Sequence, residues 1–122
     1  MEGLSINTGS NSKPAIKVFY DCDCLSETDF ISVLLGIEEE GIPYDVQAVH
    51  CSDVLKLAHD ASLESRLGVG VGISKEGIVL QYEKLDIAAP LFRIKLYQTD
   101  LFRKIGSNAA RLVKKLPFKK LD

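Results

Sequence analysis

The sequence predicts a single α/β domain in which helices cover a mostly parallel sheet. Short β-branched and aromatic segments alternate with longer segments of helical periodicity, and clusters of glycine, proline and serine separate them. The 122 residues are 46% hydrophobic and 26% charged, which suits one buried core. We therefore expect a Rossmann-like three-layer sandwich with one antiparallel hairpin over residues 15–122, after a mobile tail over residues 1–14.

The first half of the domain alternates strand and helix twice. "IKVFY" (16–20) is apolar and β-branched, which predicts a buried strand. A helix follows from an N-cap at Ser26 to Glu40, where a glycine and a proline end it. "YDVQAV" (44–49) predicts the second strand, and Ser52 the N-cap of the second helix.

The second half begins with a hairpin. "LGVGVGI" (67–73) and "IVLQY" (78–82) predict antiparallel strands joined by the turn "SKEG". "FRIKL" (92–96) predicts a short strand, and Thr99 caps a last helix that runs to about Leu116. The apolar positions of that helix form one stripe, as a helix lying on a sheet requires: Leu101, Ile105, Ala109, Leu112 and Leu116.

The glycines of "GVGVG" (68–72) do not predict a nucleotide site. A phosphate loop places its glycines between a strand and a helix, whereas a hairpin follows here. Alternate positions put all three glycines on one face of a strand, where they leave room for a close neighbour.

Composition excludes several classes of protein. A net charge of -2 disfavours a nucleic-acid binder, and no apolar run reaches the length of a membrane span. The N-terminus lacks the pattern of a signal peptide. We expect a cytoplasmic protein whose three cysteines are reduced thiols.

Four residues with soft ligand atoms follow the first two strands. Cys22 and Cys24 follow the first, and His50 and Cys51 follow the second, so parallel pairing would bring them to one edge of the sheet. C-x-C spacing is poor for zinc, and loop cysteines without a metal are the favoured interpretation. Since no nucleophile and base stand at a recognisable spacing, we expect no catalysis and no bound cofactor in the isolated chain.

Three consecutive glutamates in "GIEEEGIP" (36–43) pose a question. They end a helix, where the helix dipole disfavours carboxylates by roughly 0.3 to 1 kcal/mol each. A helical wheel places Glu39 opposite the core face of Phe30, Val33, Leu34 and Ile37, on a stripe with Thr28, Ser32 and Leu35. Either these glutamates are solvated, or Glu39 meets a cation at an interface.

Gly106 and Asn108 are unusual within the last helix. A small residue and a polar one predict the close approach of another element, either the domain's own or a partner's. Lys114 and Lys115 have a simpler explanation, because cations favour a helix C-terminus.

Several segments together resemble one family. "IKVFYD", "GIEEEGIPY", "LGVGVGISKEGIVLQYEKL", "APL" and "IGSNAARLVKKLPF" are similar, in order and spacing, to the small subunit of diol dehydratase and glycerol dehydratase reactivating factors over about residues 16–118. The segment "CDCLSETD" lies outside this resemblance.

The resemblance implies a non-catalytic partner. In that family a large chaperone-like ATPase subunit, which binds ATP and ADP, pairs with the small subunit as α2β2. The complex releases damaged cobalamin from adenosylcobalamin-dependent dehydratases, and the small subunit, which resembles the dehydratase β subunit, exchanges with it. A location within a bacterial microcompartment and the choice between glycerol and propane-1,2-diol dehydratase stay open.

The resemblance also implies a role for Glu39. Its position matches the second glutamate of the family pattern G-[IL]-E-E, which helps to hold Mg²⁺ at the junction with the large subunit. We predict a partner interface that contains Thr28, Leu35, Glu39, Gly106 and Asn108. The alternatives are a β-type subunit of the dehydratase itself and a free-standing flavodoxin-like ligand-binding module.

Overall fold

The computed structural model describes residues 13–121, so most of the predicted N-terminal tail lies outside the described residues. Its strands are β2 (Ile16–Asp21), β3 (Tyr44–Val49), β4 (Val69–Ser74), β5 (Gly77–Tyr82) and β6 (Phe92–Ile94). Its helices are α1 (Ile31–Glu39), α2 (Val54–Glu64) and α3 (Phe102–Lys114), with 3-10 turns η1 (Glu27–Phe30) and η2 (Thr99–Leu101). Among these helices, none is both long enough and apolar enough to cross a bilayer.

The five strands form one mixed sheet in the order β3-β2-β4-β5-β6. β2 pairs in parallel with β3 and β4, whereas β4–β5 and β5–β6 are antiparallel. The prediction of a mostly parallel, Rossmann-like sandwich is therefore wrong. Parallel pairing needs a long crossover, usually a helix, but a tight turn joins β4 to β5 and residues 83–91 contain no helix before β6.

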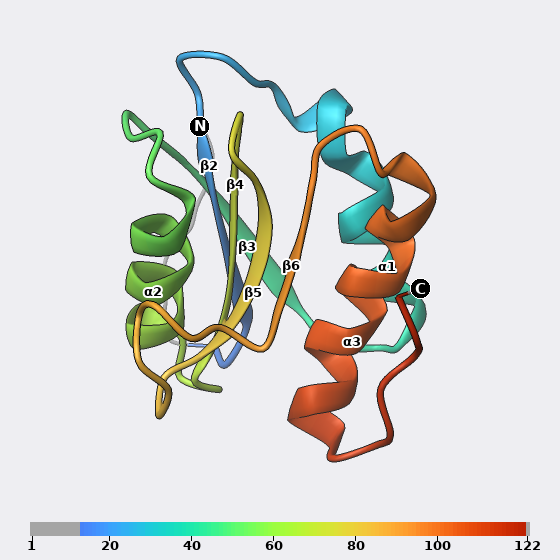
Figure 1. The fold of residues 1–122 in the computed structure, drawn as a ribbon. Coiled ribbons are helices and arrows are strands. Elements are labelled where there is room, and N and C mark those ends of the chain that lie inside the picture. The colour runs from blue at the N-terminus through green and yellow to red at the C-terminus, as the bar shows by residue number, and fades with distance from the viewer. Residues whose placement is uncertain (1–12, 122) are drawn as a thin grey trace.

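Helices cover both faces of this sheet (Figure 1). α2 lies against one face, and α1 and α3 lie side by side against the other. The main core fills the space between the sheet and this helix pair. The predicted core face of α1 is confirmed, because the side chains of Phe30, Val33, Leu34 and Ile37 are at most 2% exposed.

The glycines of β4 permit α2 to lie close to the sheet. A Cβ atom at Gly70 would collide with the backbone of Ser62, and one at Gly72 with the backbone of Ala58. The predicted close neighbour is thus confirmed for these two positions. Gly68 differs, because it precedes the strand with a φ of +74° in the left-handed region, so the prediction that all three glycines share a strand face is wrong there.

Helix ends shift by a few residues from the predicted positions. Ser26 precedes a 3-10 turn, where its backbone N donates to the Asp29 carboxylate at 2.9 Å. Asp53, not Ser52, caps α2, because its side chain accepts from the backbone N of Lys56 at 3.2 Å. α3 ends at Lys114, before the predicted Leu116, since the next residue adopts a left-handed conformation.

Candidate functional site

Helices α1 and α3 touch at backbone distance. A Cβ atom at Gly36 of α1 would overlap the carbonyl oxygen of Arg103, and one at Gly106 of α3 would overlap that of Val33. The close neighbour predicted at Gly106 is therefore α1 of the same domain. This crossing brings Glu39 and Glu40, at the acidic end of α1, against polar side chains of α3.

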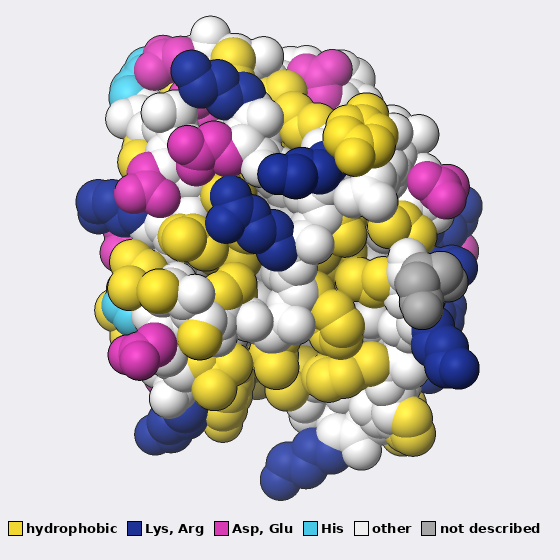
Figure 2. Space-filling model, viewed as in Figure 1, with side chains coloured by type: hydrophobic (Ala, Val, Ile, Leu, Met, Phe, Trp, Pro, Cys, Tyr) yellow, Lys and Arg dark blue, Asp and Glu magenta, His cyan; other side chains and the backbone are white. Residues whose placement is uncertain are grey.

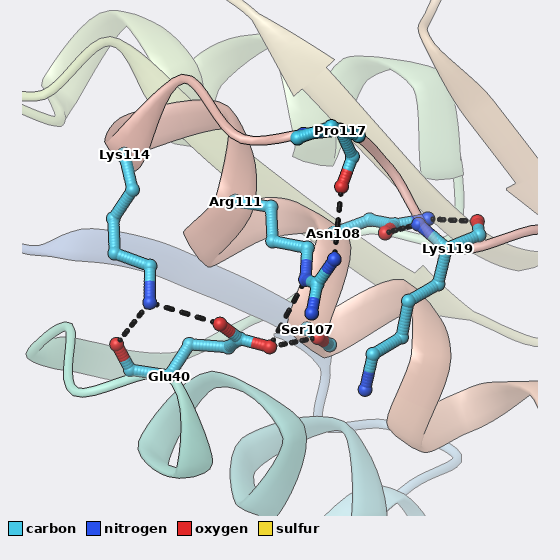
Figure 3. Close-up of polar contacts among 7 residues, drawn as sticks. All are labelled: Glu40, Ser107, Asn108, Arg111, Lys114, Pro117 and Lys119. Carbon is cyan, nitrogen blue, oxygen red and sulfur yellow. Dashed lines mark hydrogen bonds and ion pairs between the residues drawn. The ribbon is translucent and has the colours of Figure 1, made fainter.

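Glu40 accepts hydrogen bonds from three side chains of α3 (Figure 3). Ser107 Oγ donates to Oε2 at 2.6 Å, Arg111 Nε donates to the same oxygen at 3.1 Å, and Lys114 Nζ donates to Oε1 at 2.9 Å. The Glu40 side chain is only 12% exposed. On the helical wheel Glu40 lies on the flank of the core face. In the structure α3 covers this flank and encloses the carboxylate.

This network answers the question that the three glutamates pose. Lys114 Nζ also donates to the backbone carbonyl of Glu40 at 2.8 Å, so one cation serves both the carboxylate and the helix C-terminus. The hydrogen bonds from Ser107, Lys114 and Arg111 lower the pKa of Glu40 from 4.5 to about 2. The unfavourable dipole contact is therefore offset within the domain, and Lys114 acts on α1 rather than on its own helix.

Glu39 lies on the outer surface and is 49% exposed, as the wheel predicts. Arg103 of α3 contacts it through Nε at 3.0 Å and through a terminal guanidinium nitrogen at 2.7 Å. Both contacts go to Oε2, and among residues 13–121 no hydrogen bond or ion pair is found at Oε1. The side chain is half exposed, so the carboxylate remains accessible to solvent.

Apolar side chains accompany Glu39 along the outer face of α1. Leu35 is 37% exposed and Ile31 is 48% exposed. Thr28 is exposed in η1, where its hydroxyl lies 3.0 Å from that of Ser26. Three of the predicted interface residues, Thr28, Leu35 and Glu39, thus lie at the surface, and their contact with a partner stays a prediction.

Gly106 and Asn108 lie inside the domain instead. Asn108 is fully buried and binds the backbone of Lys119 twice, through Nδ2 to the carbonyl at 2.9 Å and through Oδ1 from the amide at 2.6 Å. Arg111 donates from a terminal nitrogen to the carbonyl of Pro117 at 3.0 Å (Figure 3). These bonds fold the C-terminal segment, residues 115–121, back along α3, so these two helix positions make their contacts within the domain, and their role at a partner interface stays a prediction.

A second polar cluster lies at the carboxyl ends of β2 and β3. His50 Nδ1 lies 2.7 Å from Asp23 Oδ1 and 3.7 Å from Cys22 Sγ. Cys24 and Cys51 lie apart from it: Cys24 Sγ contacts Asp21 Oδ2 at 3.4 Å, and Cys51 Sγ contacts the carbonyl of Asp53 at 3.9 Å. Of the four residues predicted to converge, only Cys22 and His50 meet, and the sequence interpretation missed Asp23.

The cations around Glu39 and Glu40 were also missed, although the sequence carries a signal for them. Positions 103, 107, 111 and 114 follow the same helical spacing as the apolar stripe of α3 and form a polar stripe beside it. That pattern alone does not say which element the stripe meets. The glycine contact between α1 and α3 supplies the answer.

Comparison with known proteins agrees with the resemblance seen in the sequence. Residues 13–119 match the family described as the dehydratase medium subunit. The chain belongs to this family. A relative from Citrobacter freundii, the propanediol dehydratase-reactivating factor small subunit, is 46% identical over 108 residues, which cover 87% of this chain and 90% of the relative. The Salmonella typhimurium protein of the same name is 41% identical over 113 residues, which cover 92% of this chain and 96% of that relative.

Two solved structures share the fold of this family member. One, from a diol dehydratase-reactivating factor complexed with ADP and Mg²⁺, has a TM-score of 0.82 and 39% identity, and covers 89% of this chain and all of the other. The other, from a glycerol dehydratase reactivase, has a TM-score of 0.84 and 31% identity. The match covers 90% of this chain and all of the other. The predicted resemblance to reactivating factor small subunits is confirmed.

Proposed function

We propose that this chain is the small subunit of a reactivating factor for adenosylcobalamin-dependent diol or glycerol dehydratase. The observation that carries the proposal is 46% identity to a reactivating factor small subunit across 90% of that protein. In this role the chain pairs with a large ATPase subunit as α2β2 and leaves it when the dehydratase β subunit takes its place. The exchange lets damaged cobalamin escape from the dehydratase, so that intact coenzyme can enter.

The chain itself contributes binding, not chemistry. ATP and ADP belong to the large subunit in this proposal, because the sequence contains no G-x-x-x-x-G-K-[ST] phosphate loop. The thiols of Cys22, Cys24 and Cys51 are unpaired, which suits the reducing cytoplasm in which we place the complex.

Exposed apolar surface supports a working state within a complex. The described surface exposes Ile31, Leu35 and Tyr97, the last at 81%. On the face drawn in Figure 2, hydrophobic side chains also gather in the lower half, between α2 and α3. Such exposure is typical of protein interaction sites.

We assign the contact with the large subunit to the outer face of α1, around Thr28, Leu35 and Glu39. The donor set there fits Mg²⁺, which takes carboxylate oxygens one or two at a time and fills its other positions with water. Glu39 Oε1 is the available oxygen, while Arg103 holds Oε2 and fixes the orientation of the carboxylate. Further ligands must come from the partner or from water, so the ion would bind at the junction of the two chains.

A substitution at Glu39 tests this assignment. Glu39→Gln should weaken pairing with the large subunit in the presence of Mg²⁺ and should remove the dependence of pairing on Mg²⁺. Glu38→Gln is the matched control, because this neighbouring glutamate is exposed at the same helix end. Titration calorimetry with and without Mg²⁺ decides: equal losses for both variants would indicate a general acidic patch, and unchanged pairing of Glu39→Gln would refute the magnesium role.

The family description favours one alternative, a β-type subunit of the dehydratase itself. Partner choice separates the two functions. The purified chain should form a stable complex with the reactivating factor large subunit and should not complete a functional dehydratase when mixed with the other dehydratase subunits. A dehydratase that gains catalytic turnover from this chain, without the reactivating factor large subunit, would establish the alternative.

A further inference from the structure

Parallel pairing of β2 and β3 places Cys22 beside His50. The register aligns Asp21 with Val49, and the backbone N of Cys22 donates to the carbonyl of Val49 at 3.0 Å. The next residue on each strand, Cys22 and His50, therefore projects from the same edge of the sheet. In Figure 1 this is the upper edge, opposite the end of α1 that carries Glu39.

Three different ligand atoms converge there. One ligand atom each of Cys22, Asp23 and His50 lies within 4.8 Å of the others. Cys22 Sγ is 3.7 Å from Nδ1 and 3.9 Å from Nε2 of His50, and Asp23 Oδ1 is 2.7 Å from His50 Nδ1. The backbone at Asp23 is fixed by a hydrogen bond in which the Asp23 N donates to Asp21 Oδ1 at 3.0 Å.

These separations can be compared with a tetrahedral zinc site. Zn–S and Zn–N bonds of about 2.3 and 2.0 Å place sulfur and nitrogen about 3.6 Å apart, close to the 3.7 Å between Cys22 Sγ and His50 Nδ1. Because Sγ lies almost as close to Nε2, at 3.9 Å, the imidazole must also turn to direct one nitrogen at a shared ion. The carboxylate must move away from the imidazole by roughly 0.7 Å to reach the corresponding N···O separation of about 3.4 Å. The side chains of His50 and Asp23 are 80% and 62% exposed, so both have solvent around them into which to move.

We propose that Cys22, Asp23 and His50 form a site for a thiophilic divalent cation, with Zn²⁺ as the best match. A thiolate and an imidazole favour Zn²⁺ over Mg²⁺, which prefers oxygen ligands. Three protein ligands leave the fourth tetrahedral position to water. The site is independent of the proposed pairing at Glu39, since the two lie at opposite ends of the sheet and use different ligand chemistry.

The chain offers matched controls for this site. Cys24 and Cys51 lie close in sequence to the three ligands but make their contacts elsewhere, with Asp21 and Asp53. Cys22→Ser and His50→Gln remove a ligand from exposed or partly exposed positions, where the fold is not expected to depend on them. Circular dichroism and thermal unfolding without metal verify that each variant is folded.

Titration of the purified full chain with Zn²⁺ tests the site, with Co²⁺ as a spectroscopic substitute. The wild type should bind one ion per chain and show the near-ultraviolet sulfur-to-cobalt absorption, with no displacement by excess Mg²⁺. Cys22→Ser should abolish that absorption, and both ligand variants should lose at least tenfold in affinity. Cys24→Ser and Cys51→Ser should bind as the wild type does.

Three results would overturn the proposal. They are a wild-type chain that binds no Zn²⁺, a ligand variant that binds as tightly as the wild type, and a control variant that loses affinity as strongly as Cys22→Ser does.

Discussion

Removing the charge of Glu40 should cost more stability than removing any other charge at the end of α1. A pKa lowered from 4.5 to about 2 corresponds to about 3 kcal/mol of favourable interaction with the charged form. Because the side chain remains 12% exposed and its cationic partners are partly solvated, screening reduces this value. Glu40→Gln retains the shape of the side chain and an oxygen that can accept from the Ser107 hydroxyl, and we expect it to lose about 1 to 3 kcal/mol of unfolding free energy at pH 7.

The pH dependence gives the same prediction a second test. Since the pKa of Glu40 is lower in the folded state than in the unfolded state, its contribution is fully present above about pH 4.5 and is lost as the pH falls toward 2. The difference between the wild type and Glu40→Gln should therefore be constant from pH 7 to about pH 5 and shrink below it. Urea unfolding at each pH measures it, with Glu38→Gln as the control that should change stability by less than about 0.5 kcal/mol. Equal losses for the two variants, or a difference that does not shrink in acid, would refute the role of the network.

Substitutions at three further positions test the packing around α3. Gly106→Ala should destabilise the domain by roughly 1 to 3 kcal/mol, because its Cβ meets the Val33 carbonyl, and thermal unfolding that matches the wild type would contradict the helix contact. Lys115→Gly should stabilise it by about 0.5 to 1 kcal/mol, because glycine adopts the observed φ of 60° without strain; a lower melting temperature would refute this. Asn108→Ala should remove the hydrogen-exchange protection of the Lys119 amide, because the acceptor of its hydrogen bond is lost. Asn108→Asp keeps an acceptor oxygen and should retain part of this protection. Equal protection in Asn108→Ala and the wild type would show that the bond is unimportant.

The strands, the hairpin and the buried face of α1 could be predicted, because each depends on a pattern within a short segment of the sequence. The hairpin between β4 and β5 follows from a tight turn between two β-branched segments, and the buried face of α1 follows from helical spacing. The direction of β6 relative to β5 could not be predicted from such local signals. Residues 83–91 leave β5 without a helix, and the antiparallel return into β6 depends on how that loop crosses the sheet.

The candidate site shows the same limit. A helical wheel places each glutamate relative to the core of its own helix, which located the exposed Glu39 correctly. It cannot show that α3 covers the flank where Glu40 lies, because that depends on the close approach of Gly36 to α3 and of Gly106 to α1, two helices far apart in the sequence. That Cys22 and His50 lie close together could be predicted from the positions of the strand ends. The loop conformation that brings Asp23 to His50 could not.

Release of cobalamin tests the central claim most directly. An inactivated diol or glycerol dehydratase carrying damaged cobalamin is mixed with ATP, Mg²⁺ and the large reactivating subunit, with or without this chain, and free cobalamin is measured by its absorbance after filtration. If this chain is the small reactivating subunit, the reconstituted complex releases cobalamin in an ATP-dependent manner, and little is released when this chain or the large subunit is omitted. Release by the large subunit that is equally fast without this chain, or no release with both, would contradict the account.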